Sequence, residues 1–195
     1  MNIYPVNKLL TSFTLVMIIL LISGCTPKQK PITDEKQKDN NTTEKLADPD
    51  SVYSIIMVGD MMLGTNYPSA ASLPPDDGRD ILNDPKEILQ SADVTIGNLE
   101  GTLLNSGGTP KVCANPENCV AFRMPEHYAG YMKDAGFDMM NLANNHSGDM
   151  GDIGRKSTQN TLKQYGIEYA GHLSAPTAIF VKDGIKFGLT GFAPN

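Results

Sequence analysis

Three short segments of the sequence carry side chains that could bind a metal ion or transfer a proton. Asp60 directly follows the apolar run "SIIMV" and a glycine, Glu100 lies in "IGNLEG", and His146 lies in "NLANNHSGDMG". Carboxylate and amide oxygens, together with imidazole, suit a divalent metal ion. Such an ion can polarise a phosphoryl or carbonyl oxygen and generate hydroxide from bound water. A histidine can also donate a proton near neutral pH.

Each segment has a simpler structural interpretation when it is taken alone. Asp60 could cap a turn, Glu100 could be a solvated turn residue, and adjacent asparagines favour turns. A single histidine is more often structural than catalytic. The functional interpretation gains weight because all three segments follow apolar runs.

These apolar runs predict strands that alternate with helices, which is typical of an α/β fold with a layered sheet and flanking helices. The strands are expected over residues 54–58, 93–101, 137–143 and 167–171, and the helices over 84–92, 125–137 and 152–165. Two further apolar runs flank Asp183-Gly184, which predicts a hairpin. Ligands of such folds lie beyond the carboxyl ends of the strands. The segments of Asp60, Glu100 and His146 are therefore expected to converge.

The first 51 residues differ in composition from the rest of the chain. A polar start and an apolar run lead to "LISGC", which resembles a bacterial lipobox, so we expect a lipoprotein signal peptide over 1–24 and lipid attachment at Cys25. An ordinary signal peptide or an uncleaved anchor is the alternative. Residues 25–51 are polar and predict a flexible linker, followed by a folded domain over 52–195. The expected location is the bacterial cell envelope, on the extracytoplasmic side of the membrane.

Charge and cysteine content restrict the partners and the environment. The formal net charge is −6 and no basic cluster occurs in the folded part, which argues against nucleic acid as a partner. Cys113 and Cys119 lie close together in "KVCANPENCV". Outside the cytoplasm this spacing predicts a small disulfide. A metal-binding pair is the alternative, but it lacks two further ligands.

The motifs "VGDMMLG", "IGNLEG" and "LANNHSGDMG", followed by the segment from 161 to 192, resemble the capsule synthesis CapA (poly-γ-glutamate synthesis) family. That family is similar to the calcineurin-like metallophosphoesterases. The resemblance covers most of residues 54–195, in order and at comparable spacing. It implies a metallophosphoesterase-like sheet and a function in capsule or poly-γ-glutamate biosynthesis. The implied partners are an anionic polymer or the membrane proteins of capsule synthesis.

The resemblance also implies roles for individual residues. A divalent metal ion (Mn, Fe, Zn or Mg) would be held by Asp60, Asn98, Glu100 and Asn145. His146 would act as an acid or stabilise the transition state, and Asp149 would orient it through a hydrogen bond.

Two departures from the superfamily pattern bear on these roles. The first motif reads Asp60-Met61-Met62, where the superfamily often has Asp-x-His, and the later histidine-bearing loops do not occur before Asn195. An incomplete domain is therefore expected. His127 is expected on a helix surface, whereas His172 follows a strand and is an alternative residue of the cleft. The sequence leaves open a metal-dependent hydrolase, a non-enzymatic polymer-binding or export factor, and an inactive fragment.

Overall fold

The computed structural model describes residues 51–193. The predicted signal peptide, the lipid-attachment site Cys25 and the linker up to residue 50 lie outside the described residues. Within 51–193, no helix combines the length and apolar character needed to cross a bilayer.

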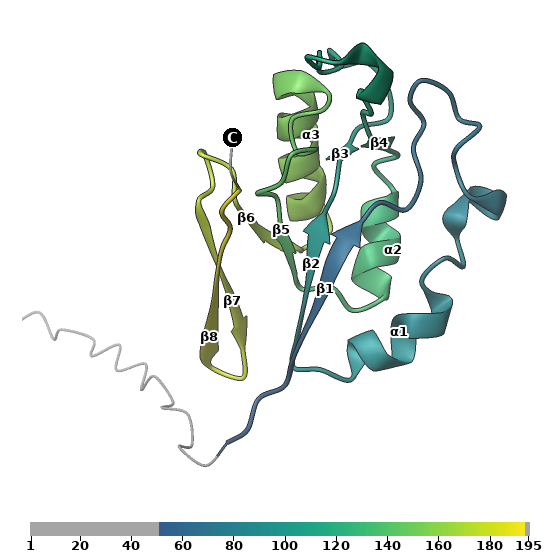
Figure 1. Cartoon of the computed structure of the whole chain (residues 1–195). Helices are drawn as coiled ribbons and strands as arrows, with labels where there is room; N and C mark the ends of the chain where they lie inside the picture. Colours follow the sequence, from purple (N-terminus) through teal and green to yellow (C-terminus); the bar gives the residue numbers. More distant parts are fainter. Residues whose placement is uncertain (1–50, 194–195) are drawn as a thin grey trace, which may run out of the picture. The chain divides into compact units, whose positions relative to one another are not determined.

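The centre of the fold is a four-stranded parallel sheet with the strand order β1-β2-β5-β6 (Figure 1). Its strands are β1 (Ile55–Met61), β2 (Val94–Leu99), β5 (Met139–Asn141) and β6 (Glu168–Ala170). Because the strands are parallel, the loops that leave their carboxyl ends meet at one edge of the sheet. The predicted α/β class is confirmed.

Three helices cover one face of this sheet. They are α1 (Asn83–Gln90), α2 (Tyr128–Asp134) and α3 (Gly151–Gln164). Each contributes to the larger buried cluster, in which they pack against Leu99, Phe137, Met140 and Leu142. Successive residues of a strand point to opposite faces, and the neighbouring Met139 accordingly belongs to a second cluster.

A β-hairpin covers the other face, formed by β7 (Thr177–Lys182) and β8 (Ile185–Thr190). Its residues Ala178, Phe180 and Phe187 pack against the sheet at Val94 and Met139. In Figure 1 the hairpin and the helices α1 and α2 lie on opposite sides of the sheet. The turn uses Asp183 and Gly184 with φ angles of 52° and 85°, the left-handed conformation that a two-residue hairpin turn requires.

Smaller elements connect the sheet to the site. β3 (Thr102–Leu103) and β4 (Arg123–Met124) form a short parallel pair, and the 3-10 helices η1 (Pro75–Gly78) and η2 (Pro116–Asn118) lie in the loops. The sequence did not predict these pieces, because two to four residues are too short to show a periodic pattern.

The main difference from the predicted elements concerns where the strands end. β1 was expected to stop at residue 58, but it continues to Met61 after an irregularity between Met57 and Asp60. Asp60 and Asn98 are therefore paired within the ladder and not in the loops beyond it. The predicted helix over 125–137 is shorter in the structure, where α2 spans only Tyr128–Asp134.

Candidate functional site

The carboxyl ends of β1, β2 and β5 bring polar side chains together. Asp60 is the register partner of Asn98, and Asn98 is in turn the partner of Asn141. The amide nitrogen of Asn98 donates a hydrogen bond to Asp60 Oδ1 at 2.6 Å and approaches Glu100 Oε2 at 3.5 Å. The convergence of the Asp60 and Glu100 segments follows from this parallel register.

Three asparagines form a hydrogen-bonded chain behind these carboxylates. Asn98 Oδ1 accepts hydrogen bonds from Asn141 Nδ2 at 2.7 Å and from Asn144 Nδ2 at 3.1 Å. Asn141 is oriented by the backbone of Ala143, whose nitrogen donates to its oxygen and whose carbonyl accepts from its nitrogen. The Asn144 side chain donates a hydrogen bond to the carbonyl of Leu99 and accepts one from the backbone nitrogen of His146.

This hydrogen-bonded chain of asparagines fixes the orientation of the Asn98 amide. The backbone determines which end of Asn141 and Asn144 is the donor, so the group that faces both of them must be an acceptor. Asn98 therefore turns its oxygen away from Asp60 and its NH₂ group towards the carboxylates. In this arrangement Asn98 is a hydrogen-bond donor at the site.

The two carboxylates lie close enough to affect one another. Burial, followed by a hydrogen bond with Asp60 and its negative charge, raises the pKa of Glu100, while the charge of His146 acts in the opposite direction. The Glu100 side chain is 14% exposed, whereas Asp60 is exposed. A pair of like charges with little compensation is an environment that favours a bound cation.

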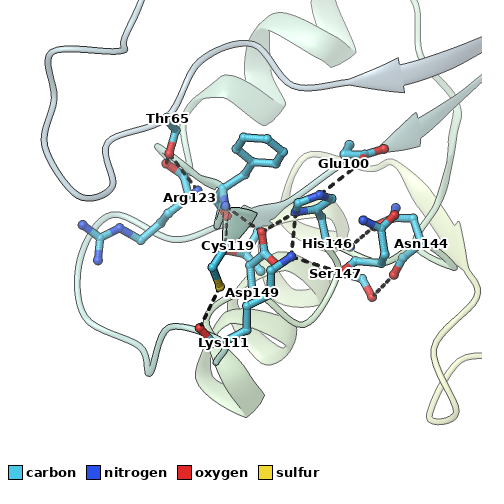
Figure 2. Close-up of polar contacts among 12 residues, drawn as sticks. Thr65, Glu100, Lys111, Cys119, Arg123, Asn144, His146, Ser147 and Asp149 are labelled. Carbon is cyan, nitrogen blue, oxygen red and sulfur yellow. Dashed lines mark hydrogen bonds and ion pairs between the residues drawn. The ribbon is translucent and has the colours of Figure 1, made fainter. Parts of the chain in front are cut away.

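His146 is held by a buried carboxylate. The Asp149 side chain is 0% exposed. It accepts a hydrogen bond from His146 Nδ1 at 2.7 Å and another from the backbone nitrogen of Phe122 at 2.6 Å. The Phe122 ring lies 4.4 Å from the imidazole, centroid to centroid. The opposite nitrogen, Nε2, faces Glu100 Oε1 at 3.6 Å (Figure 2). One ring nitrogen of His146 is thus held by Asp149, and the other is directed at Glu100.

Lys111 completes this group, and nothing in the sequence pointed to it. Its Nζ lies 2.7 Å from Asp149 Oδ1 and 3.1 Å from His146 Nδ1, and it donates to the Asn145 carbonyl at 3.4 Å. A disulfide joins Cys113 to Cys119 just beyond it, and Cys119 Sγ contacts the Lys111 carbonyl at 3.7 Å. The segment that leads into the disulfide-closed loop therefore supplies the cation that pairs with the buried Asp149.

The remaining candidates from the sequence lie in different places. Asn145 is exposed and contacts Lys111 through its backbone carbonyl, whereas the side chain of Asn144 donates to Asn98. His127 lies at the surface, where it pairs with Asp77 at 2.6 Å. His172 is buried next to the His146 loop, in a pocket that also contains Asn144.

A glycine allows the loops after β5 and β6 to approach each other. Gly171 has a φ of 114°, and a Cβ at this position would collide with the backbone nitrogen of Ala143. Any other residue would be both strained and obstructed here. Gly171 therefore sets the position of the segment that begins the His146 loop.

The side chains fit a metal ion only in part. The described residues 51–193 hold no group of three or more His, Cys, Asp or Glu side chains placed to bind a metal together. Asp60 and Glu100 offer neighbouring carboxylate oxygens that suit a hard cation. Asn98 presents its nitrogen to them, so it does not serve as an oxygen ligand in this orientation.

Replacing Glu100 with glutamine is expected to raise the melting temperature of the metal-free protein at neutral pH. Because the pKa of Glu100 is raised in the folded state, the folded protein binds this proton more tightly than the unfolded chain, and ionisation costs stability. This gain in melting temperature should disappear as the pH falls below 4.5, the ordinary pKa of a glutamate carboxyl, because Glu100 is then protonated in both the folded and the unfolded state. Calorimetry in EDTA from acidic to neutral pH measures the difference in melting temperature between Glu100→Gln and the wild type. The exposed Glu168→Gln serves as the control, and a lower melting temperature for Glu100→Gln at neutral pH would contradict the prediction.

The fold and the site define an α/β protein whose strand ends gather carboxylates, asparagines and a carboxylate-bound histidine. A family model described as "Bacterial capsule synthesis protein PGA_cap" matches residues 54–194, and the chain belongs to that family. The CapA-like identity predicted from the sequence motifs is thereby confirmed.

The chain is also similar to individual proteins. The chain is 26% identical over 157 residues to the capsule biosynthesis protein CapA of Bacillus anthracis, covering 80% of this chain and 35% of the relative. It is 38% identical over 88 residues to each of two uncharacterized proteins of Sinorhizobium fredii, y4sH and y4uA, covering 44% of this chain and 18% of each relative. The chain thus spans about a third or less of the length of these relatives.

Proposed function

We propose that this chain acts in capsule or poly-γ-glutamate biosynthesis as a metal-dependent hydrolase of metallophosphoesterase-like architecture. The observation that carries this proposal is the position of His146 between the buried Asp149 and Glu100, whose carboxylate lies beside that of Asp60. An imidazole that is oriented on one side and directed at charged groups on the other is suited to proton transfer. Membership of a capsule synthesis family supports the biological process.

The side chains have distinct parts in this mechanism. Asp60 and Glu100 would hold a divalent ion (Mn, Fe, Zn or Mg), which polarises a phosphoryl or carbonyl oxygen and activates water when bound. Asp149 accepts a hydrogen bond from the Nδ1–H group of His146 and so directs Nε2 towards Glu100. In its doubly protonated form, His146 would donate the Nε2 proton to the oxygen of the leaving group and would keep the Nδ1 proton, hydrogen-bonded to Asp149. Lys111 holds the Asp149 carboxylate in place through their ion pair at 2.7 Å.

The proposal extends to location and partners. The predicted lipid at Cys25 would hold the chain on the extracytoplasmic side of the envelope membrane. There it would meet an anionic polymer such as poly-γ-glutamate and the membrane proteins that synthesise or export the capsule. This part of the proposal rests on the sequence of the first 51 residues and on the family.

A second candidate is a non-enzymatic polymer-binding or export factor. The orientation of Asn98 favours it, because an NH₂ group hydrogen-bonded to Asp60 neutralises part of the charge that a cation would need. In that case the same cleft would bind polymer through hydrogen bonds and would not catalyse its cleavage.

One experiment separates the two candidates. The full chain is incubated with a chromogenic phosphodiester or with poly-γ-glutamate, in Mn²⁺ or in EDTA, and bound metal, product and polymer binding are measured. The hydrolase predicts turnover that requires the cation and is lost in Asp60→Asn, while Asp84→Asn, at an exposed position of α1, remains active. Polymer binding in EDTA, without turnover in Mn²⁺, would overturn the hydrolase and support the binding factor.

A further inference from the structure

A pocket of about 690 Å³ lies beside the His146 loop. Its walls come from the loop after β5, the first turns of α3, the loop after β6 and the segment after β8. Asn144 and Ser147, which belong to the His146 loop, form part of the wall. Its volume is in the range of sites that enclose small ligands.

Two cations of α3 line this pocket. Arg155 and Lys156 are both exposed, and Asp152 is the one carboxylate among the described lining residues. Asp152 pairs with Arg155 at 2.9 Å. No described carboxylate forms an ion pair with Lys156, so the pocket carries a positive charge in a chain whose formal net charge is −6.

A buried histidine adds a hydrogen-bond donor without a partner. His172 is 8% exposed, and its Nδ1 accepts from Gln159 Nε2 at 2.7 Å. Gln159 Nε2 also donates to Ser174 Oγ at 3.0 Å. Burial, followed by the charge of Arg155, lowers the pKa of His172 and so favours the neutral ring. Because the Gln159 NH₂ group can only donate, Nδ1 is the acceptor and the proton of the neutral ring lies on Nε2.

This Nε2 has no hydrogen-bond partner in residues 51–193. A buried donor that is left unsatisfied is unfavourable, and an acceptor oxygen from a ligand would remove that cost. The donor and the two cations line the same pocket. Together they fit a group with negative charge and several acceptor oxygens.

We propose that this pocket binds a carboxylate or phosphate group through Arg155, Lys156 and the Nε2–H of His172. Asn144 connects the pocket to the asparagine chain behind the Asp60–Glu100 pair, because it lines the pocket and donates to Asn98. The pocket and the His146 site therefore share one loop. The proposal goes beyond the proposed hydrolysis and does not require it.

Calorimetric titration of the full chain tests this proposal with two probes, inorganic phosphate and a γ-linked glutamate trimer. We expect saturable binding of at least one probe, which identifies the group as phosphate or carboxylate. Each of Arg155→Ala and Lys156→Ala should weaken that binding about tenfold or more, because each removes a charged hydrogen-bond donor. Lys163→Ala, an exposed lysine further along α3, is the matched control.

Two further measurements distinguish binding in this pocket from a change in fold and from binding at the His146 site. The nitrogen resonance of His172 Nε2 should shift on binding, and it should do so without any change in fold. Binding should also persist in Asp60→Asn, so that loss of turnover and loss of pocket binding are distinguished. The proposal is overturned if neither probe saturates, or if Arg155→Ala, Lys156→Ala and Lys163→Ala bind alike.

Discussion

Replacing Asp149 with alanine is expected to destabilise the fold by about 3 kcal/mol or more, the lower end of the range for breaking a buried ion pair. The carboxylate is completely buried and serves Lys111, His146 and the Phe122 nitrogen together. Its removal leaves three donors without their acceptor. The effect stays near the lower end because the Lys111 side chain is 25% exposed and can turn to water.

Urea unfolding followed by circular dichroism measures this change. Asp152→Ala, three residues along the chain and 85% exposed, is the control and should alter stability by no more than about 0.5 kcal/mol. In a double-mutant cycle, Lys111→Met should cost much less in the Asp149→Ala background than in the wild type. Equal losses for Asp149→Ala and Asp152→Ala would show that the buried pair contributes nothing.

Replacing His146 with alanine is expected to lower kcat by about 10²- to 10⁴-fold, the usual contribution of a general acid. The loss should appear in cation-dependent phosphodiester or polymer cleavage, with metal content unchanged. The reason is geometric, since Nε2 is the proton donor of the proposed mechanism and lies 3.6 Å from Glu100 Oε1. Circular dichroism should show that the fold is retained, because His146 is not part of the two large buried clusters.

The matched control for this variant is His127→Ala. His127 is 44% exposed and pairs with Asp77, away from the strand ends. It should therefore leave turnover within experimental scatter of the wild type. Full turnover in His146→Ala would remove this histidine from the mechanism, whereas equal losses in both variants would indicate a general effect on folding.

The sequence predicted the site well where strand pattern alone determines position. Asp60, Glu100 and His146 were placed together because each follows an apolar run, and parallel register does bring these segments together. Asn144 and Asn145 show the limit of this reasoning. Adjacent residues of a turn point in different directions, and no pattern in "NLANNHSGDMG" distinguishes which one contacts Asn98.

Lys111 illustrates a second limit. It lies 38 residues before Asp149 and belongs to a loop without periodicity, so its ion pair depends on how that loop folds back. The orientation of Asn98 is equally inaccessible from sequence, because it depends on backbone contacts of two other asparagines. The α/β class, in contrast, could be predicted because it requires only that strands alternate with helices, and the apolar runs of the sequence show this alternation.

The parallel order of the central sheet has a consequence for the timing of assembly. Asp60 and Asn98 are neighbours in space but 38 residues apart in the chain, and Asn98 and Asn141 are 43 residues apart. Contacts of such long range form late in folding and slow it. The strand ends should therefore become ordered only when the whole sheet closes. Amide hydrogens of β2 and β5 should exchange at the rate of global unfolding, and the cluster of polar side chains at the strand ends should be absent from partly folded intermediates.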